Sequence, residues 1–293
     1  MPELPEVETM RRGVLAAVGC RIETVEKLRT PLKPISVKPA MPSLRKRLRG
    51  REIIAAERIG KRVVLRLETQ DRLIFEPRMT GLLLIADPPD VDHLRFRVDL
   101  SGGDLERIWY WDRRGLGSIR LCSPQQFDRE VVSRFGPDAL TITADELRDR
   151  LHRSRRAVKV ALLDQQAVAG IGNLYASEIL NRCGIHPERR CDQLTRVQWQ
   201  RLCEIIVAVL DDAIKHEGST LSDGTYRNAL NKSGGYQNQH RVYDQAGKLC
   251  RTCGQGTIQR IVQAQRSTFF CPVCQSKRRK PGGLTPPRHR RRS

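Results

Sequence analysis

The sequence has no long apolar run. No stretch of about 18 consecutive apolar residues occurs in the 293 residues, so we expect no membrane-spanning helix. The first residues, Met1 to Glu6, also lack the basic start and the apolar stretch of a secretory signal. These absences predict a soluble, cytoplasmic protein with no membrane partner. No internal repeat is present, and the length allows two domains of ordinary size.

Acidic residues are too few to balance the basic ones. The chain has 53 Lys and Arg against 33 Asp and Glu, a formal net charge of +20 and a pI near 10.2. Residues 276–293 hold eight basic residues and no acid, and Pro281, Gly282 and Gly283 interrupt them, so we expect a disordered basic tail. The rest of the chain still has a net charge of +12. This excess favours a polyanionic partner such as nucleic acid, and a merely solvated charge is the alternative.

The number and spacing of the cysteines argue against a disulfide framework. Nine Cys are present, of which five are scattered (Cys20, Cys122, Cys183, Cys191 and Cys203). The other four form two tight pairs, Cys250 with Cys253 and Cys271 with Cys274, and seventeen residues separate the pairs. That spacing suits tetrahedral zinc with four thiolate ligands, and such a site leaves no open position for catalysis. We therefore predict one structural zinc ion.

Residue patterns divide the chain into two kinds of structure. Residues 1–17 are typical of a short helix that begins near Pro5, and residues 94–100 alternate apolar and charged side chains ahead of a Ser-Gly-Gly-Asp turn. Further strands are predicted at residues 62–67, 73–75 and 118–122. The pattern indicates an antiparallel sandwich or barrel that one helix enters.

The second half is predicted to be helical. Thr143 with Glu146 and Thr195 with Gln198 have the spacing of capping boxes. After the second box, apolar residues recur at helical intervals and describe one buried face: Trp199, Leu202, Ile206, Val209 and Ala213. The pair Gly136-Pro137 marks the expected boundary between the halves.

The N-terminus is a candidate nucleophile. Removal of Met1 would expose the secondary amine of Pro2, and α-amines titrate near pH 8, well below lysine. Glu3 beside it could deliver and remove protons. The alternative is that residues 2–6 are only a well-formed helix start.

Two further segments carry polar or basic groups that suit phosphate. In residues 168–178, Gly170 and Gly172 permit a tight turn, and Asn173 is expected to cap the helix that follows, whose backbone N–H groups could hold a phosphate. Cations precede this segment: Arg153, Arg155, Arg156 and Lys159. Between the cysteine pairs, a two-stranded finger would hold Arg266 towards a phosphate, although an ordinary surface arginine fits the spacing equally well.

Three stretches together resemble the formamidopyrimidine-DNA glycosylase family: residues 2–9 (PELPEVET), 169–178 (AGIGNLYASE) and 265–271 (QRSTFFC). The resemblance extends over about residues 2–275. It implies an α+β fold with an N-terminal helix and antiparallel β-sandwich (2–130, catalytic), a helical helix-two-turns-helix domain (138–235), a four-cysteine zinc finger (241–275) and the basic tail (276–293). It also implies base-excision repair of damaged double-stranded DNA, in which oxidised purines such as 8-oxoguanine and formamidopyrimidines are removed.

The resemblance assigns roles to individual residues. Pro2 matches the nucleophile, Glu3 the catalytic acid and Glu6 its helper. Lys61 matches the lysine tied to β-elimination, and Arg266 the finger arginine tied to δ-elimination. Contacts with DNA carry over to a further set: Met79, His93, Arg114, Arg155, Lys159 and Asn173.

The chain departs from the family pattern beside Arg114. The usual Asp-x-Arg-Arg-Phe-Gly is Asp-Arg-Arg-Gly-Leu-Gly here, so Gly115 replaces an arginine that faces the estranged base, and Leu116 replaces the phenylalanine wedge. Leucine can still wedge a base step but cannot stack on a base. This departure puts a preference for cytosine opposite the lesion in doubt.

The functional prediction is a bifunctional DNA glycosylase and abasic-site lyase, which cleaves by β,δ-elimination. We expect a monomer, associated with the nucleoid of a bacterium. Two alternatives belong to other classes. One is a non-catalytic zinc-finger protein that binds abasic or distorted DNA, and the other is an RNA-binding module whose function depends on the basic tail.

Overall fold

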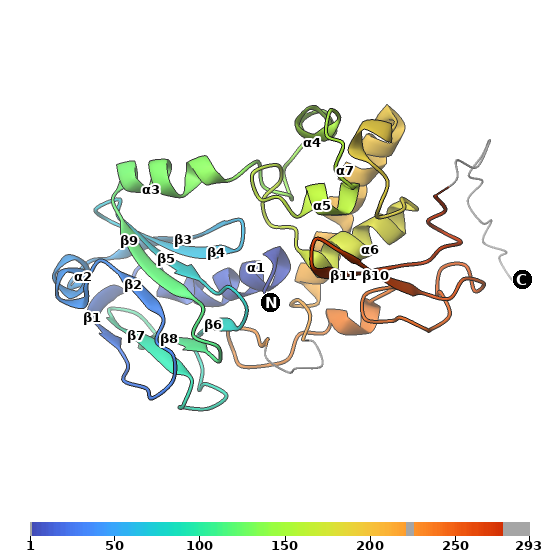
Figure 1. The fold of residues 1–293 in the computed structure, drawn as a ribbon. Coiled ribbons are helices and arrows are strands. Elements are labelled where there is room, and N and C mark those ends of the chain that lie inside the picture. Colours follow the sequence, from blue (N-terminus) through green and yellow to red (C-terminus); the bar gives the residue numbers. More distant parts are fainter. Residues whose placement is uncertain (1, 221–225, 278–293) are drawn as a thin grey trace, which may run out of the picture.

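Two stacked β-sheets build the first half of the protein in this computed structural model, which describes residues 2–220 and 226–277 (Figure 1). One sheet has the strand order β1 (Arg21–Lys27), β7 (Leu94–Ser101), β8 (Arg107–Asp112), β6 (Gly81–Leu84). The other has the order β2 (Ser36–Lys38), β9 (Ser118–Cys122), β5 (Arg72–Glu76), β4 (Arg62–Leu67), β3 (Ile53–Ile59). Apolar side chains from both sheets share one core, as expected where strands alternate inward and outward residues.

The sandwich is antiparallel except at one edge. The expected hairpin is present, with Val98 opposite Ile108, and the strands predicted at residues 62–67, 73–75 and 118–122 all form. The predicted antiparallel sandwich is confirmed, with one parallel pair at its edge: β2 runs parallel to β9, with Ser36 opposite Ser118. Because residues 36 and 118 are far apart in sequence, no hairpin dictates the direction of this three-residue strand.

Helices cover the sandwich at its edges and outer face. Helix α2 (Met41–Leu48) packs on β1, and α3 (Pro124–Glu130) lies over the five-stranded sheet. Phe127 of α3 and Val131 just after it pack on Val64 and Ile74 of the sheet and form a small second core. A 3-10 turn, Val132–Arg134, then leads towards the helical half.

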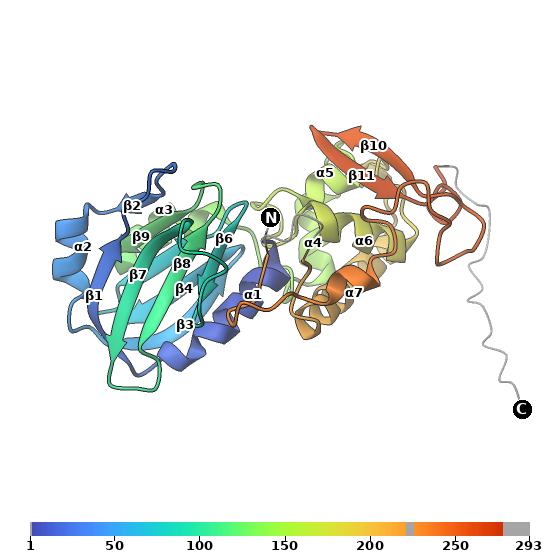
Figure 2. The ribbon, with the colours of Figure 1, turned by 90° about the horizontal axis from the view of Figure 1, so that it is seen from below.

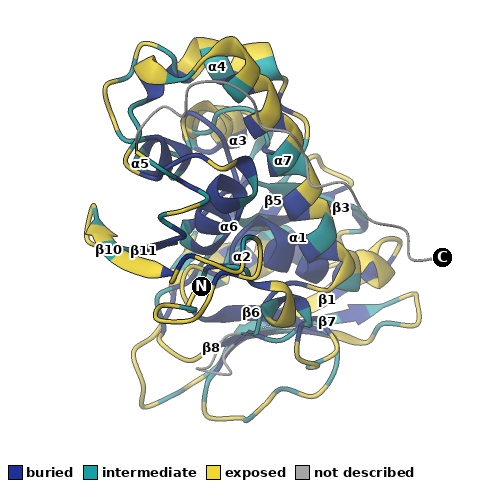
Figure 3. Cartoon of the chain, turned by 90° about the vertical axis from the view of Figure 1, so that its right-hand side faces the viewer, coloured by how far each residue is buried: buried dark blue, intermediate teal, exposed yellow. Residues whose placement is uncertain are grey.

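The helical half contains α4 (Ala144–Leu151), α5 (Val158–Leu162), α6 (Asn173–Cys183) and α7 (Arg196–Lys215). Both predicted capping boxes are formed, at Thr143 and at Thr195. The predicted apolar face of α7 is buried along its whole length. Helix α6 is the most enclosed of the four and lies at the centre of this half (Figure 3). Short 3-10 turns at Cys191–Gln193 and Tyr236–Gln239 connect these elements.

Helix α1 (Leu4–Gly13) belongs to both halves. Its first residue, Leu4, is buried in the helical core, whereas Val7 and Met10 are buried in the sandwich core. A 3-10 turn, Val14–Ala17, ends it, so the helix predicted for residues 1–17 is confirmed for its described part. Figure 2 shows α1 lying between the two halves, with the N-terminus at their junction.

A two-stranded finger follows the helices. Strands β10 (Gln259–Gln263) and β11 (Arg266–Phe270) pair antiparallel, and β11 packs against α6. Most of the predicted basic tail, residues 278–293, lies outside the described residues, as do residues 221–225. Within the described ranges, the structure contains no helix with the length and apolar character needed to span a membrane.

Candidate active site

The starts of helices α1 and α6 meet at the junction of the two halves. Glu3 directs its carboxylate at the first turn of α6, where Oε1 accepts a hydrogen bond from the Leu174 amide (3.0 Å) and Oε2 from the Tyr175 amide (3.5 Å). In return, the Leu4 amide donates to the Gly170 carbonyl (3.1 Å). A helix N-terminus carries unpaired N–H groups and a positive dipole end, so it stabilises a carboxylate there. Glu3, which directly follows Pro2 in the chain, is therefore held with its carboxylate at the start of α6.

Two glycines make this contact possible. A Cβ on Gly172 would lie 2.2 Å from the Glu3 carboxyl carbon, and a Cβ on Gly170 would lie 2.4 Å from Leu4 Cδ1. Gly170 also has a φ of +109°, which disfavours other residues. We call this contact region, residues 2–4 and 170–175, the N-terminal junction. The prediction that Asn173 caps α6 was wrong, because Gly172 holds the N-cap position and Glu3 supplies the side-chain acceptor.

Glu6 lies behind Glu3 and is 3% exposed. Its carboxylate accepts hydrogen bonds from the Glu3 amide (2.8 Å), the Tyr175 hydroxyl (2.5 Å) and the Ser219 amide (2.9 Å). Burial and the neighbouring Glu3 charge raise the pKa of Glu6, against the effect of these hydrogen bonds. The motif that contains Tyr175 was recognised in the sequence, but its hydrogen bond to Glu6 could not be read from spacing.

Lys61 enters the site from the tight turn between β3 and β4. Gly60 in this turn has a φ of +54°, and a Cβ there would lie 3.0 Å from the Phe135 ring. Burial is the main cause that lowers the pKa of Lys61, and Arg266 adds to it, whereas the charges of Glu3 and Glu6 oppose the shift. A lysine in such surroundings is closer to releasing its proton at neutral pH than an exposed one.

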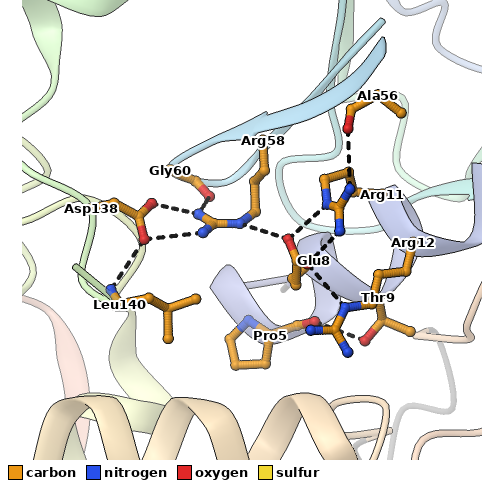
Figure 4. A network of polar contacts seen from close by, with 10 residues as sticks. All are labelled: Pro5, Glu8, Thr9, Arg11, Arg12, Ala56, Arg58, Gly60, Asp138 and Leu140. Atoms are coloured by element: carbon orange, nitrogen blue, oxygen red, sulfur yellow. Dashed lines mark hydrogen bonds and ion pairs between the residues drawn. The ribbon is translucent and has the colours of Figure 1, made fainter. Parts of the chain in front are cut away.

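A partly buried ion-pair network fixes this turn against the helical half (Figure 4). Arg58 donates to the Gly60 carbonyl (3.0 Å) and to both carboxylate oxygens of Asp138 (2.7 and 3.0 Å). The same guanidinium donates to Glu8 of α1 at 3.2 Å, and Arg11 and nearby cations hold the pKa of Glu8 below its usual range. The network joins a strand, a helix and the helical half, and no sequence pattern had pointed to it.

A pocket of about 450 Å³ lies where residues of the sandwich, the helical half and the finger meet. Four of the predicted site residues line it together: Pro2, Lys61, Asn173 and Arg266. Its wall also includes Arg62 and Glu76, which form an ion pair at 3.0 Å. No sequence motif had pointed to Glu76 as a site residue. The other predicted site residues do not line this pocket: Glu3, Glu6, Met79, His93, Arg114, Leu116, Arg155 and Lys159.

Lys159 and Asn173 attach the finger to the helical half. Lys159 is fully buried, and its ammonium donates to Asn173 Oδ1 (2.6 Å), Thr268 Oγ1 (2.6 Å) and the Ser267 carbonyl (3.2 Å). Asn173 Nδ2 donates to the same carbonyl (2.9 Å). Burial lowers the pKa of Lys159 to about 8. The predicted phosphate contact of Lys159 is not supported, because all three protons are donated inside the protein; the residue positions the strand that begins with Arg266.

Glu178 provides a second attachment. This fully buried carboxylate on α6 accepts hydrogen bonds from three consecutive amides, those of Arg241 (2.9 Å), Val242 (3.0 Å) and Tyr243 (2.8 Å). It therefore holds the chain where it leaves for the finger. Glu178 is the one carboxylate of α6 and is followed directly by Ile179 and Leu180, and this was the sequence signal that could have revealed its role.

The four paired cysteines converge in the finger. Their sulfur atoms all lie within 4.8 Å of one another, with Cys250 and Cys274 at 3.8 Å and Cys253 and Cys271 at 3.7 Å. A tetrahedron with Zn–S bonds of about 2.3 Å has S–S edges of about 3.8 Å, so this donor set fits a zinc ion. The Gly256 and Cys274 amides donate to two of the sulfurs, at 3.4 Å each. The finger core is small, and a metal would be its main source of stability.

The predicted DNA-contacting loops lie beside the sandwich. Met79 is 38% exposed, and its neighbour Thr80 donates to buried Asp112 (2.5 Å), which ties this loop to the one that carries Arg114. Gly115 has a φ of +59°, and a Cβ there would lie 2.2 Å from the Lys33 carbonyl oxygen. The loop therefore has no room for the arginine found in the family.

The remaining residues predicted to contact DNA differ in their exposure and in their contacts within the protein. Arg114 and Arg155 are exposed, and Leu116 is half-buried. The His93 ring lies against Trp111 at 5.3 Å between centroids, and its Nδ1 is 2.7 Å from Asp90. The structure leaves the DNA roles of these residues as predictions.

Comparison with known proteins gives a consistent result. Residues 1–119 match the model described as formamidopyrimidine-DNA glycosylase N-terminal domain, residues 135–225 match the formamidopyrimidine-DNA glycosylase H2TH domain, and residues 247–277 match a zinc finger found in FPG and IleRS. A formamidopyrimidine-DNA glycosylase of Chloroflexus aggregans is 39% identical, covering 94% of this chain and 98% of the relative. One of Gluconobacter oxydans is 38% identical, covering 94% and 100%.

Solved structures agree with these relatives. Lactococcus lactis Fpg in complex with DNA that contains an abasic site has a TM-score of 0.82 and 33% identity, covering 94% of this chain and 100% of the other. The same wild-type enzyme with N7-benzyl-Fapy-dG DNA has a TM-score of 0.83 and 35% identity, with the same coverage.

Proposed function

Because this chain belongs to the formamidopyrimidine-DNA glycosylase family, we propose that it removes oxidised purines from damaged duplex DNA and then cleaves the strand at the abasic site. The observation that carries the proposal is the pocket in which Pro2, Lys61, Asn173 and Arg266 converge. It combines a candidate amine nucleophile with cations for the flanking phosphates. The base must leave the stack to reach such a pocket, which costs a few kcal/mol.

Pro2 and Glu3 are proposed to perform the excision. Once Met1 is removed, the Pro2 nitrogen attacks C1′ of the damaged nucleotide, and the bond from C1′ to the base breaks. Glu3 is held beside it by the α6 amides and serves the proton transfers of ring opening and base departure. The product is an iminium link between Pro2 and the sugar.

Strand cleavage is proposed to follow from that iminium. It withdraws electrons and acidifies the C2′ proton, so the 3′ phosphate leaves by β-elimination and the 5′ phosphate by δ-elimination. Lys61 faces this chemistry with a lowered pKa, which suits a proton acceptor. Arg266 holds a departing phosphate as a fixed cation.

The finger is proposed to carry one structural zinc ion, bound by Cys250, Cys253, Cys271 and Cys274. When bound, the metal supplies folding energy to the finger and no chemistry to the reaction, because four thiolates fill its coordination sphere. Lys159 and Asn173 bind the strand that begins with Arg266, and Glu178 binds the chain just before the finger. We also propose that the protein is a monomer in the bacterial cytoplasm, near the nucleoid. Light scattering can test the monomeric state.

Borohydride trapping tests the mechanism directly. On an 8-oxoguanine duplex, reduction should link the protein to DNA, and peptide mapping should place the link at Pro2 of molecules that have lost Met1. Glu3→Gln should lower the excision rate by about 100-fold or more, because proton transfer is lost. It should still be trapped on a preformed abasic site, where no base has to leave.

Controls separate the site from the fold. Pro42 also stands in the first turn of a helix, α2, but is exposed and lies outside the pocket, so Pro42→Ala should be trapped normally. Active protein that retains Met1, or a cross-link at a residue other than Pro2, would contradict the mechanism.

The base opposite the lesion is a separate question. Because Gly115 presents no side chain, we propose a weak preference among opposing bases. Gel analysis of 8-oxoguanine paired with each of the four bases reports excision and cleavage together. A strong preference for cytosine would contradict this part of the proposal.

A further inference from the structure

Two short loops cross side by side from one sheet of the sandwich to the other. Residues 77–80 lead from the end of β5 to the start of β6, and residues 113–117 lead from the end of β8 to the start of β9. The residues that bound the two loops are strand partners at both ends: Glu76 with Ser118, and Gly81 with Asp112. We call these loops the paired crossings. Because each end of one is fixed to an end of the other, their positions depend on each other.

A buried carboxylate joins the paired crossings. Asp112 is fully buried, and its Oδ1 accepts hydrogen bonds from the Thr80 hydroxyl (2.5 Å) and the Arg114 amide (3.2 Å). Its Oδ2 accepts the Gly117 amide (2.8 Å). The Arg114 amide also donates to Thr80 Oγ1 (3.0 Å). A buried carboxylate needs donors in place of water, and these donors come from both crossings. One side chain therefore fixes the two loops together.

A buried hydroxyl supports the crossings as well. Tyr110 is 1% exposed, and its hydroxyl donates to the Glu76 carbonyl (3.0 Å). A Cβ on Gly81 would lie 2.4 Å from this hydroxyl oxygen, and a Cβ on Gly117 would lie 1.8 Å from it. Both crossings thus close directly over Tyr110, which is possible because these two residues have no side chain.

The crossings carry exposed side chains next to the pocket. Glu76 and Arg78 line the pocket, so the first crossing begins at its wall, and the exposed Met79 follows directly. The second crossing presents the exposed Arg114 and the half-buried Leu116. A base that leaves the stack opens a gap in the duplex, and apolar side chains can enter such a gap.

We propose that Asp112 is a positioning residue that couples Met79 of the first crossing to Arg114 and Leu116 of the second, so that they enter the gap as one unit. Leu116 cannot stack on a base, and Gly115 beside it has no side chain. The second crossing therefore fills the gap poorly by itself, and the coupling lets each loop favour insertion of the other. This role rests on the proposed function.

Thr80→Val tests the coupling with little change in shape, because valine lacks only the hydroxyl that Asp112 accepts. The probe is a duplex with a tetrahydrofuran abasic analogue opposite 2-aminopurine, whose fluorescence reports its stacking. At saturating protein, the fluorescence change should fall by about half or more in Thr80→Val, and the affinity should fall about tenfold. Thr80→Ser keeps the hydroxyl and should restore both.

Asp112→Asn provides a second variant. The asparagine amide group must face one of the donors that the carboxylate accepts, so the loss should be at least as large as in Thr80→Val. Wild-type fluorescence and affinity in both Thr80→Val and Asp112→Asn would overturn the proposal.

A double-mutant cycle measures the coupling itself. Met79→Ala and Leu116→Ala should each weaken binding of the same duplex. In the wild-type background, their combined effect should depart from the product of the single effects by about fivefold, whereas in Thr80→Val the effects should multiply. Independent effects in the wild type, or the same departure in Thr80→Val, would contradict the coupling.

Single-stranded DNA separates positioning from folding. A single strand with an abasic site has no duplex gap to fill, so borohydride trapping on it should be equal in the wild type and in Thr80→Val. An equal loss of trapping on single and double strands would show a purely structural role and overturn the proposal.

Asp99 provides the matched control. It lies on β7 and accepts a hydrogen bond from Arg107 (2.6 Å) at the end of β8 that is opposite to Asp112. Asp99→Asn should keep the wild-type fluorescence and affinity, and losing them would mean that the probe does not report on the crossings. Absence of excision and trapping in the wild type would instead overturn the proposed function, while the binding cycle, which needs no reaction, would still decide the coupling.

Discussion

The N-terminal junction and the finger contribute residues to the same pocket but are built differently. At the junction, two helix starts touch through backbone groups, and the space for Glu3 exists only because residue 172 has no side chain. The finger strand with Arg266 is held by Lys159 of the helical half, Glu178 holds the chain just before the finger, and four thiolates converge inside it. The junction should therefore be sensitive to added volume, and the finger to metal and charge.

Gly172→Ala should produce the largest effect. Its Cβ would lie 2.2 Å from the Glu3 carboxyl carbon, so the carboxylate has to move away from the α6 amides. A displacement of about 1 Å at a reacting group can cost about 100-fold in rate, and we expect at least that loss in single-turnover excision.

Gly235→Ala is the control for this substitution, because a Cβ there meets nothing closer than 3.6 Å. It should retain the wild-type excision rate. A Gly172→Ala protein that excises normally would show that the junction tolerates volume, and the contrast with the finger would disappear.

Removal of the metal should break the finger and spare the junction. A structural zinc site supplies about 10–16 kcal/mol of apparent binding energy, far more than the small apolar finger core can replace. After chelation, affinity for abasic-analogue DNA should fall about tenfold or more, as phosphate contacts are lost. Borohydride trapping at saturating DNA should persist, and added Zn²⁺ should restore affinity. Equal loss of trapping and affinity would mean that the two regions are not independent.

The charge of Lys159 should appear in the pH dependence of stability. Its pKa is lowered to about 8 in the folded protein, below its usual value of 10.5. Between these values the unfolded chain keeps a proton that the folded protein has released, so the free energy of unfolding rises with pH over this window. The rise should be at most about 3 kcal/mol, and denaturant titrations should show it in the wild type but not in Lys159→Met. An equal rise in the free energy of unfolding in the wild type and in Lys159→Met would mean that groups other than Lys159 cause it.

The smallest effect should come from the finger turn. Ala264 and Gln265 both have positive φ, 45° and 60°, in a two-residue hairpin that glycine would adopt without strain. Gln265→Gly should therefore stabilise the protein by about 1 kcal/mol. Gln259→Gly on the exposed strand β10 should destabilise it by about 0.5–1 kcal/mol. Thermal unfolding of the full chain compares them, and a loss of stability in Gln265→Gly would argue against turn strain.

Local patterns predicted local structure well. The capping residues Thr143 and Thr195 lie three residues before the amides from which they accept hydrogen bonds, and the strand at residues 94–100 follows from alternation within a few residues. The cysteine pairs also reveal themselves by spacing. In each case, the interacting groups are neighbours in the chain, so their geometry follows from the helix, strand or loop that carries them.

Predictions that depended on distant partners were less successful. Asn173 has the residue type of a cap, but Glu3, which precedes Leu174 by 171 residues, arrives at the first amides of α6 and leaves Asn173 to bind the finger. Lys159 has the charge of a phosphate ligand, yet Thr268 and Ser267 bury it. The ion pairs of Arg58 with Glu8 and Asp138 gave no local signal.

The sequence by itself determined the elements, the four-thiolate site and, through three motifs, the family. Only the tertiary structure decided which motif residues face the pocket and which hold the scaffold, as it did for Lys159 and Glu178. The physical reason is that a charged side chain has the same chemistry in both roles. Its burial and its partners separate them, and these arise when segments far apart in sequence pack together.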